Sequence, residues 1–356
     1  MSIVILLFSI TLLICGVGII INKKGKEHDL QKISVVIVAR NEEKIVPQML
    51  ESLREIDYPE ELYEILLVDD CSRDNTGKLF DDFALSIKNV RVLKITEESK
   101  ELPGKKEGLQ QALEAARNDI ILLTDADCLV RPTWLRNTSR YWDQETKMIV
   151  GYAPEDYSKL LKNAPLVKKL SYCLRRFSQI TNGGIFAATI GLGRPFSCYG
   201  RNLALSREKL LGAGGYRNLP HNQSGDDKQI LNLMNSLPGK IRYAPQRSVV
   251  TYPELSGFHE QQKRRFGKLR MSSSLYFLIT ILIIGFFIYL PVRVIGFNDY
   301  RSFFVFFLSA FMVWVINLLK HQERFSLFDP VFIIIYPYFM IYYTILGLKG
   351  DWQWKN

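Results

Sequence analysis

The distribution of apolar residues constrains this chain more than any other feature of its sequence. Residues Ile3 to Ile21 form one apolar run. Three further runs lie near the C-terminus, at about Leu275 to Val294, Phe303 to Leu319 and Pro330 to Leu346. Because a helix rises about 1.5 Å per residue and a bilayer core is roughly 30 Å thick, each run is long enough to cross a membrane. The sequence therefore predicts four membrane-spanning helices around a middle segment of soluble composition.

Basic residues beside these runs predict the orientation of the chain. Lys23, Lys24 and Lys26 follow the first run, residues 263–265 precede the second, and residues 320–324 separate the third from the fourth. By the positive-inside rule all three groups lie in the cytoplasm. The first run has neither a preceding charge nor a cleavage site, so we interpret it as a retained anchor. We expect a multi-pass protein of the cell or inner membrane, with its middle segment cytoplasmic.

Charge and cysteine content exclude several classes of protein. The chain has 46 Lys and Arg against 36 Asp and Glu, an excess that the cytoplasmic flanks of the membrane runs explain, so we expect no nucleic-acid partner. Its five cysteines are widely spaced without a Cys-x-x-Cys pair, and its four histidines form no His-x-x-x-His pair. We therefore predict reduced thiols and no zinc site. Any chemistry must rest on carboxylates.

The middle segment alternates strand-like and helix-like stretches. The predicted strands are Ile33 to Ala39, Glu64 to Val68, Val90 to Ile95 and Asp119 to Thr124. The helix-compatible stretches between them are Glu42 to Glu55, Asn75 to Ser86 and Lys105 to Arg117. This order predicts an α/β domain with a mostly parallel sheet and helices on both faces. The expected domains are residues 1–22 (membrane helix), 31–270 (α/β domain), 272–348 (three membrane helices) and 349–356 (tail).

Acidic residues follow three of the predicted strands. They occur in residues 40–43, in Asp69-Asp70 and in Asp125-Ala126-Asp127. Ligands of parallel sheets bind beyond the carboxyl ends of the strands, where these acids would repel one another unless a cation or hydrogen-bond donors lie between them. Asp-x-Asp can offer two carboxylates to a hard divalent ion. A lone Asp-Ala-Asp is weak evidence, since a solvated loop has the same sequence, but its position after a strand strengthens the prediction.

Seven motifs in order resemble glycosyltransferase family 2. They are VVIVARNEE (35–43), LLVDDCSRDNT (66–76), PGKKEGLQQAL (103–113), LTDADC (123–128), YGRNLA (199–204), SGDDKQI (224–230) and QKRRF (262–266). The resemblance covers about residues 31–270, and flanking membrane spans are typical of the membrane-bound members. It implies a GT-A fold that transfers a sugar from a nucleotide-sugar to an acceptor hydroxyl with inversion.

The resemblance also implies roles on the donor side. Asp127 would bind Mg²⁺ or Mn²⁺, and Asp125 would contact the ribose or the metal. The other residues expected at the nucleotide are Ala39, Arg40, Glu42, Asp69, Asp70 and Lys105. Lys106 and Gln110 depart from the Ala and Asn that the family usually has. The alternative for Lys105 is a solvated position at a helix N-terminus.

On the acceptor side, the resemblance places the catalytic base at Asp227 and a supporting carboxylate at Asp226. The alternative is that this pair caps a helix that begins at Lys228, and both roles are compatible. Asn202 corresponds to a loop at the sugar and acceptor pocket.

A last motif lies just before the second membrane run. Gln262, Arg265 and Phe266 match a Gln-x-x-Arg-Trp motif near the acceptor and the diphosphate, with Phe in place of Trp. Arg265 can pair with phosphate oxygens, but it also fits a purely topological role beside the membrane.

Taken together, these features predict a membrane-bound inverting glycosyltransferase with a divalent cation. Its partners would be a nucleotide-sugar, expected to be a UDP-sugar, membrane lipid, and a lipid-linked or envelope-polysaccharide acceptor. The acceptor follows from location alone. The alternatives are a nucleotidyltransferase, which usually has a Gly-rich basic loop after its first strand, and a non-catalytic nucleotide-binding scaffold or transporter.

Overall fold

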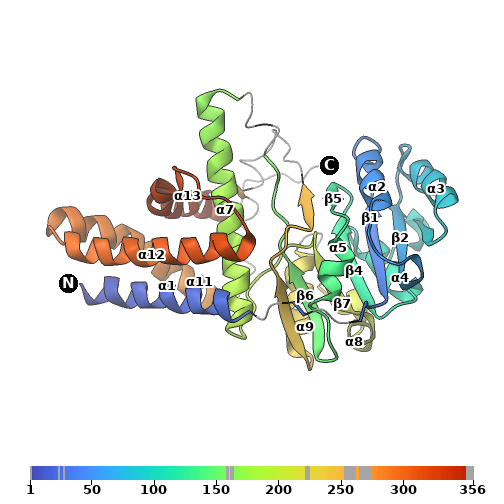
Figure 1. The fold of residues 1–356 in the computed structure, drawn as a ribbon, viewed down its shortest axis with the longest axis horizontal. Helices are drawn as coiled ribbons and strands as arrows, with labels where there is room; N and C mark the ends of the chain where they lie inside the picture. Colours follow the sequence, from blue (N-terminus) through green and yellow to red (C-terminus); the bar gives the residue numbers. More distant parts are fainter. Residues whose placement is uncertain are drawn as a thin grey trace. The chain divides into compact units, whose positions relative to one another are not determined.

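The chain divides into two compact units. The computed structural model describes residues 2–22, 25–26, 29–157, 160, 164–220, 225–251, 262–263 and 274–349 (Figure 1). One unit comprises Gly18–Asp156 and Asn182–Tyr252, and the other comprises Met1–Val17, Tyr157–Thr181 and Pro253–Asn356. The domain limits expected from the sequence remain a prediction.

A seven-stranded sheet forms the centre of the first unit. Its order is β3-β2-β1-β4-β7-β6-β8. The strands are β1 (Ile33–Ala39), β2 (Tyr63–Asp70), β3 (Val90–Ile95), β4 (Ile120–Asp125), β6 (Thr146–Gly151), β7 (Leu203–Ser206) and β8 (Lys240–Ala244). The first four are mutually parallel, while β7 runs antiparallel to both β4 and β6. The predicted α/β class with a mostly parallel sheet is thereby confirmed.

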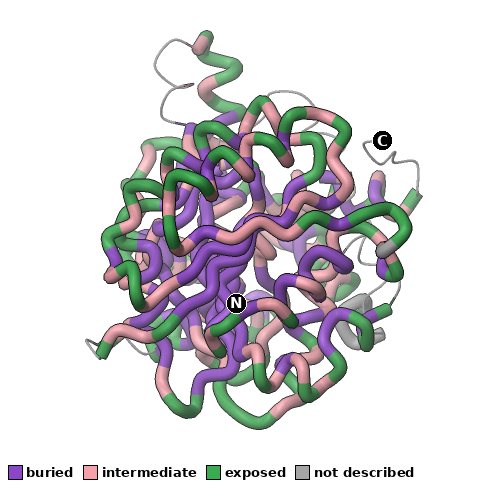
Figure 2. Tube along the Cα trace, turned by 90° about the vertical axis from the view of Figure 1, so that its right-hand side faces the viewer, coloured by how far each residue is buried: buried purple, intermediate pink, exposed green. Residues whose placement is uncertain are grey.

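Helices connect the strands of this unit. They are α2 (Val46–Arg54), α3 (Thr76–Ser86), α4 (Lys106–Ala115), α5 (Trp134–Ser139), α8 (Arg207–Gly212) and α9 (Asp226–Ser236). The described part of the unit also has the 3₁₀ turns η1 (Glu60–Leu62), η2 (Glu97–Ser99) and η3 (Gly215–Asn218), and a small pair of strands, β5 (Cys128–Val130) with β9 (Val249–Thr251). The helix expected from Glu42 begins instead at Val46, where a proline in the first turn suits the start of a helix. Buried apolar residues of β1, β2 and β4 form the core, and Figure 2 shows these central strands as buried.

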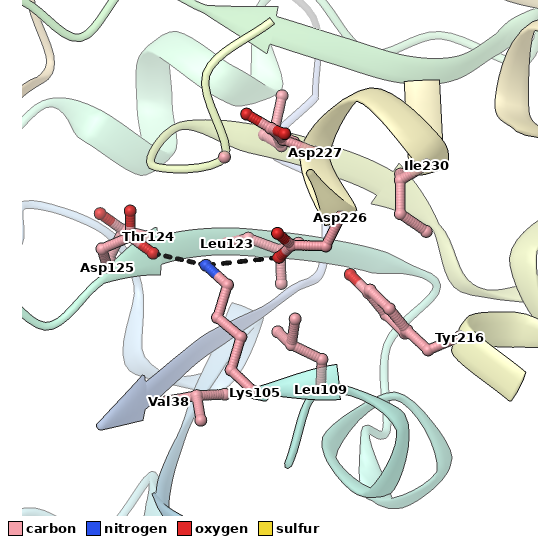
Figure 3. A pocket seen from close by; sticks show the side chains of 12 residues that line it. Val38, Lys105, Leu109, Leu123, Thr124, Asp125, Tyr216, Asp226, Asp227 and Ile230 are labelled. Carbon is pink, nitrogen blue, oxygen red and sulfur yellow. Dashed lines mark hydrogen bonds and ion pairs between the residues drawn. The ribbon is translucent and has the colours of Figure 1, made fainter. Parts of the chain in front are cut away.

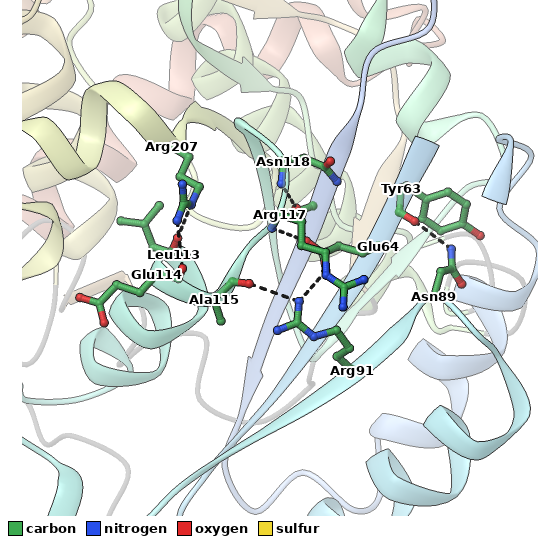
Figure 4. A network of polar contacts seen from close by, with 11 residues as sticks. Tyr63, Glu64, Asn89, Arg91, Leu113, Glu114, Ala115, Arg117, Asn118 and Arg207 are labelled. Atoms are coloured by element: carbon green, nitrogen blue, oxygen red, sulfur yellow. Dashed lines mark hydrogen bonds and ion pairs between the residues drawn. The ribbon is translucent and has the colours of Figure 1, made fainter. Parts of the chain in front are cut away.

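A buried carboxylate joins the amino ends of the central strands (Figure 4). Glu64 of β2 is only 5% exposed. It accepts hydrogen bonds from Ser34 Oγ at 2.7 Å and the Arg117 backbone N–H at 2.6 Å, and it pairs with Arg91 Nη1 at 2.9 Å. Three donors therefore satisfy a charge that would otherwise be costly to bury.

Two arginines donate hydrogen bonds to the last carbonyl oxygens of α4 (Figure 4). Arg91 Nη1 donates to the Ala115 carbonyl oxygen at 3.2 Å. Arg207 donates to the carbonyl oxygens of Leu113 at 2.7 Å and Glu114 at 2.9 Å. The last carbonyls of a helix lack partners within the helix and carry partial negative charge, so cations stabilise them. The end of α4 is thus fixed to β3 and α8.

We expect Glu64→Gln to destabilise the sheet unit by about 2 kcal/mol. The change leaves Arg91 without its anionic partner, although partial exposure of that arginine reduces the loss below the value for a fully buried pair. The measurement is thermal unfolding of the purified full-length protein. Glu145→Gln is the matched control, because the Glu145–Lys240 pair is exposed to solvent and should contribute much less to stability. Equal effects of the two changes would contradict a structural role for Glu64.

Among the described residues, four helices are long and apolar enough to cross a membrane. They are Ile3–Ile21, Leu278–Gly296, Tyr300–His321 and Asp329–Lys349. They coincide with the four apolar runs and correspond to α1 (Ile3–Ile21), α11 (Ser274–Pro291) with its π-helical extension (Val292–Gly296), α12 (Tyr300–His321) and α13 (Asp329–Lys349). Their orientation in the membrane remains a prediction.

The second unit also contains the first part of α7 (Leu166–Gly191). Phe177 of α7 stacks on Trp314 of α12, with ring centroids 4.1 Å apart, and it also contacts Phe332 of α13. Arg176 forms ion pairs at 3.6 Å with both Glu323 and Asp329, at the connection between α12 and α13. Ring contacts and ion pairs together attach this part of α7 to the two helices.

Candidate active site

A pocket opens at the carboxyl ends of β1 and β4 (Figure 3). Asp125 is the last residue of β4, Lys105 directly precedes α4, and Asp226 and Asp227 begin α9. The other lining residues are Val38, Leu109, Leu123, Thr124, Gly200, Leu203, Tyr216 and Ile230. The structure therefore brings together four of the residues that the sequence analysis selected.

Lys105 connects the two acidic sides of the pocket. Its Nζ lies 2.8 Å from Asp125 Oδ1 and 3.6 Å from Asp226 Oδ2 (Figure 3). Burial disfavours the ammonium, but the two carboxylates outweigh this effect and raise the pKa of Lys105 well above its usual value. The pKa of Asp125 is lowered, since Lys105 overcomes the opposing effect of burial. Lys105 thus lies in the pocket, with carboxylate partners.

Gly200 lines the pocket close to Asp227 and Lys105. A Cβ on Gly200 would lie 3.5 Å from Asp227 Cβ and 3.9 Å from Lys105 Nζ. A larger side chain at this position would therefore extend into the space between the lysine and the carboxylate. The YGRN motif contributes backbone to the pocket through its glycine.

Asp125, Asp127 and Cys128 form a group that could hold a metal ion. One ligand atom from each lies within 4.8 Å of the others. Asp127 stands at the open edge, and loss of solvent around its carboxyl group together with the Asp125 carboxylate raises its pKa. The Cys128 Sγ donates to Asp127 Oδ1 at 3.4 Å. Two carboxylates that repel each other fit a divalent cation. The sequence did not predict that the Cys128 thiol would lie beside them.

The acids at the end of β2 have partners within the protein. Asp70 is 3% exposed, and its Oδ1 lies 2.8 Å from Lys100 Nζ. Asp69 Oδ1 accepts a hydrogen bond from the Ser72 backbone N–H at 3.1 Å. The Asp70 carboxylate is thus held in a fixed orientation, while its predicted contact with a nucleobase remains a prediction.

Residues after β1 form the neighbouring loop. Ala39 is buried at the end of the strand, and Arg40 pairs with Glu97 at 3.2 Å on the surface. Glu42 donates its backbone N–H to Thr76 Oγ1 at 2.9 Å, which ties this loop to the start of α3. The loop therefore lies beside the end of β2, as the parallel pairing of Ala39 with Asp69 requires.

Both acids of the GDD motif lie in the first turn of α9. The helix begins at Asp226, two residues earlier than expected, after Gly225 in a left-handed conformation with φ of 92°. Glycine adopts this conformation without steric cost. Asp227 Oδ1 accepts a hydrogen bond from the Lys228 backbone N–H at 2.8 Å. Asp227 therefore stabilises the helix start and also faces the pocket, so the two proposed roles are compatible.

Asn202 has its partners within the sheet unit. Asn202 is 5% exposed, its Oδ1 accepts from Trp134 Nε1 at 3.0 Å, and its Nδ2 donates to the Tyr152 carbonyl oxygen at 3.2 Å. Gln262 is buried and belongs to the unit that contains the apolar helices. Arg265 and Phe266 lie outside the described residues. Their predicted contacts with sugar, phosphate or acceptor remain predictions.

Sequence reasoning missed two buried residues of α4. Lys106 Nζ donates to Gln229 Oε1 at 2.9 Å and also to the Pro220 carbonyl oxygen, and burial lowers its pKa. Gln110 Oε1 accepts from the Tyr216 backbone N–H at 2.7 Å. Their only signal in the sequence is that they differ from the usual family residues.

The fold and its pocket define an α/β domain with carboxylates at one edge of its sheet, and the described part of the chain also contains four apolar helices. Residues 34–199 match the family model "Glycosyl transferase family 2", and this part of the chain is a family 2 glycosyltransferase domain. The resemblance seen in the sequence is confirmed.

Two proteins of known function are similar in sequence to parts of this chain. The chain is 29% identical over 115 residues to poly(ribitol-phosphate) beta-N-acetylglucosaminyltransferase TarS of Staphylococcus aureus, covering 32% of this chain and 19% of the relative. It is 28% identical over 185 residues to undecaprenyl-phosphate 4-deoxy-4-formamido-L-arabinose transferase of Proteus mirabilis, covering 52% and 51%. The match thus spans only about a fifth to a half of these relatives.

A solved structure shares the fold along nearly the whole chain. The mannosyltransferase PcManGT of Pyrobaculum calidifontis, in complex with GDP-Man and Mn²⁺, aligns with a TM-score of 0.52 and 17% identity. The alignment covers 96% of this chain and 97% of that one. At this identity the likeness shows the fold alone, which is GT-A.

Proposed function

We propose that this protein is a membrane-bound inverting glycosyltransferase that moves a sugar from a nucleotide-sugar to an acceptor hydroxyl. The observation that supports this most directly is the Lys105 contact with both Asp125 and Asp226, in a family 2 domain. Through this contact, Lys105 connects Asp125, which we expect at the donor, to helix α9, which carries the expected base Asp227. One pocket therefore offers groups for both halves of a transfer reaction.

On the donor side, Asp125 and Asp127 would hold Mg²⁺ or Mn²⁺. Their mutual repulsion and the closeness of their ligand atoms fit such an ion, and PcManGT was solved with Mn²⁺. When bound, the ion neutralises negative charge on the leaving diphosphate. Lys105 stays protonated and attracts the same diphosphate. Ala39, Arg40, Glu42, Asp69 and Asp70 would line the nucleotide pocket.

On the acceptor side, Asp227 would act as the general base. The acceptor oxygen forms a bond to the anomeric carbon, the bond from that carbon to the diphosphate breaks, and the proton of the hydroxyl moves to the Asp227 carboxylate. Attack from the face opposite the leaving group inverts the anomeric centre. Asp226, whose Oδ2 lies 3.6 Å from Lys105 Nζ, would help to orient the first turn of α9. General bases contribute about 10²- to 10⁴-fold to a rate.

The acceptor is proposed to be lipid-linked or an envelope polysaccharide. Four helices that can cross a membrane support an acceptor at the bilayer, and the two relatives are named for an undecaprenyl phosphate and a poly(ribitol phosphate). We place the catalytic domain in the cytoplasm, where nucleotide-sugars are made. Asn202, Gln262, Arg265 and Phe266 are proposed at the acceptor or diphosphate.

The proposal predicts metal-dependent release of nucleoside diphosphate from one donor in a panel of UDP-, GDP- and TDP-sugars. Full-length protein in lipid would be assayed with membrane lipid extract as the acceptor source, and with Mn²⁺, Mg²⁺ or EDTA. We expect release from a UDP-sugar and its loss with EDTA. Release of pyrophosphate from nucleotide triphosphates would instead support a nucleotidyltransferase, and nucleotide binding without any release would support a scaffold.

A further inference from the structure

Helix α4 makes buried polar contacts with the segment that leads into the proposed catalytic helix α9. Lys106, the first residue of α4, is 2% exposed. Its ammonium donates to Gln229 Oε1 in α9 at 2.9 Å and to the Pro220 carbonyl oxygen. The Gln110 side chain, one turn further along α4, accepts from the Tyr216 backbone N–H. Helix α4 thus holds both the chain before α9 and α9 itself.

The position of Lys106 is energetically unfavourable by itself. A cation at the first residue of a helix opposes the helix dipole, and removing an ammonium from water costs several kcal/mol. Both of its hydrogen-bond partners are neutral oxygen atoms, so the contacts offset the burial without forming an ion pair. A methionine or alanine would avoid both costs, which points to a role that needs these hydrogen bonds.

The geometry indicates what that role is. Gln229 lies three residues after Asp226, so both project from one face of the first turns of α9. Lys105 contacts Asp226 and the next residue, Lys106, contacts Gln229. Two consecutive lysines therefore hold the same face of α9, one inside the pocket and one behind it.

We propose that Lys106 is a positioning residue that fixes the first turn of α9, and with it Asp226 and Asp227, relative to Lys105 and the donor edge of the sheet. This inference rests on the proposed function, in which Asp227 must lie within hydrogen-bond reach of the acceptor hydroxyl. Lys106 acts through Gln229 and is not among the residues that line the pocket. Its effect should therefore appear in turnover and not in donor affinity.

Lys147 provides a matched control. It is also a buried lysine, 3% exposed, and its Nζ donates to the carbonyl oxygens of Leu237 and Asn235, at the opposite end of α9. Replacing it removes the same kind of hydrogen bond from the same helix, but far along the chain from Asp227. It thus separates a loss of stability from a loss of alignment.

We expect Lys106→Met to lower kcat by about 10- to 100-fold, because misplacing a catalytic group by about 1 Å can cost about 100-fold. The donor KM should stay within about twofold of the wild-type value. Lys147→Met should lower the unfolding temperature of the full-length protein while kcat per folded molecule stays unchanged. A kcat for Lys106→Met equal to that of Lys147→Met would overturn the proposal.

Gln229→Leu removes the other partner of the contact. Its effect on kcat should resemble that of Lys106→Met, and the double variant should lose little more, since both changes break one interaction. If the losses in kcat of the two single variants multiplied in the double variant, the proposal would be contradicted.

Hydrogen exchange provides a readout that needs no turnover. The backbone amides of residues 227–231 should exchange faster in Lys106→Met than in Lys147→Met. If the wild-type protein released no nucleotide from any donor, the proposed function would fail, but unchanged exchange in Lys106→Met would separately refute the positioning role.

Discussion

Asp227→Asn is expected to lower sugar transfer by about 10³-fold while nucleotide-sugar binding is retained. Asparagine has nearly the same shape and can still accept the hydrogen bond that Asp227 Oδ1 accepts from the Lys228 backbone N–H. It cannot take up a proton from an acceptor hydroxyl, and a general base contributes about 10²- to 10⁴-fold. The start of α9 should therefore persist while the proton-transfer step fails.

Turnover and donor binding must be measured on the same preparation of Asp227→Asn. Binding of the donor found in the panel would be followed by calorimetry, and transfer by release of nucleoside diphosphate. Glu208→Gln is the control, because Glu208 is likewise an acid in the first turn of a helix, α8, and should leave both quantities unchanged. Full turnover by Asp227→Asn would remove Asp227 as the base.

The sequence predicts the acidic edge of the sheet well because the position of that edge depends on the local order of strands and helices along the chain. A short apolar run followed by a polar loop and a helix predicts a parallel strand, and parallel strands place their carboxyl ends together. Asp69 and Asp125 could therefore be assigned to one edge without coordinates. The paired registers of β1 with β2 and of β1 with β4 have this arrangement.

Contacts between residues far apart in the chain could not be predicted in the same way. Lys100 pairs with Asp70, and Lys106 reaches Gln229, but neither lysine differs in sequence pattern from a solvated one. Asn202 was assigned to the sugar pocket by its motif, while the structure gives its side chain hydrogen bonds to Trp134 and to the Tyr152 backbone. Antiparallel β7 is also a consequence of tertiary packing. A motif identifies such a residue, but its partners depend on the folded chain.

Asp127→Asn is expected to weaken binding of the metal ion and so to shift the metal dependence of the reaction to higher Mn²⁺ concentrations. The change keeps the size of the side chain but removes one of the two carboxylates at the proposed metal position, and with it half of the negative charge offered to the ion. Losing even an outer partner of a ligand commonly lowers metal affinity 10- to 100-fold, so we expect at least about a 100-fold loss for a direct ligand. Transfer should fall by about 10³-fold at a fixed low concentration of Mn²⁺.

Mn²⁺ binding followed by electron paramagnetic resonance measures this loss without relying on activity. Asp82→Asn, on the exposed face of α3, is the control, because it removes one carboxylate of the same domain outside the proposed site. If the ion is held by Asp127, raising the Mn²⁺ concentration about 100-fold should restore part of the transfer, since weaker binding is then compensated by mass action. Wild-type Mn²⁺ affinity in Asp127→Asn would show instead that the ion is held elsewhere and that the repulsion between Asp125 and Asp127 is balanced by Lys105 and Arg201 alone.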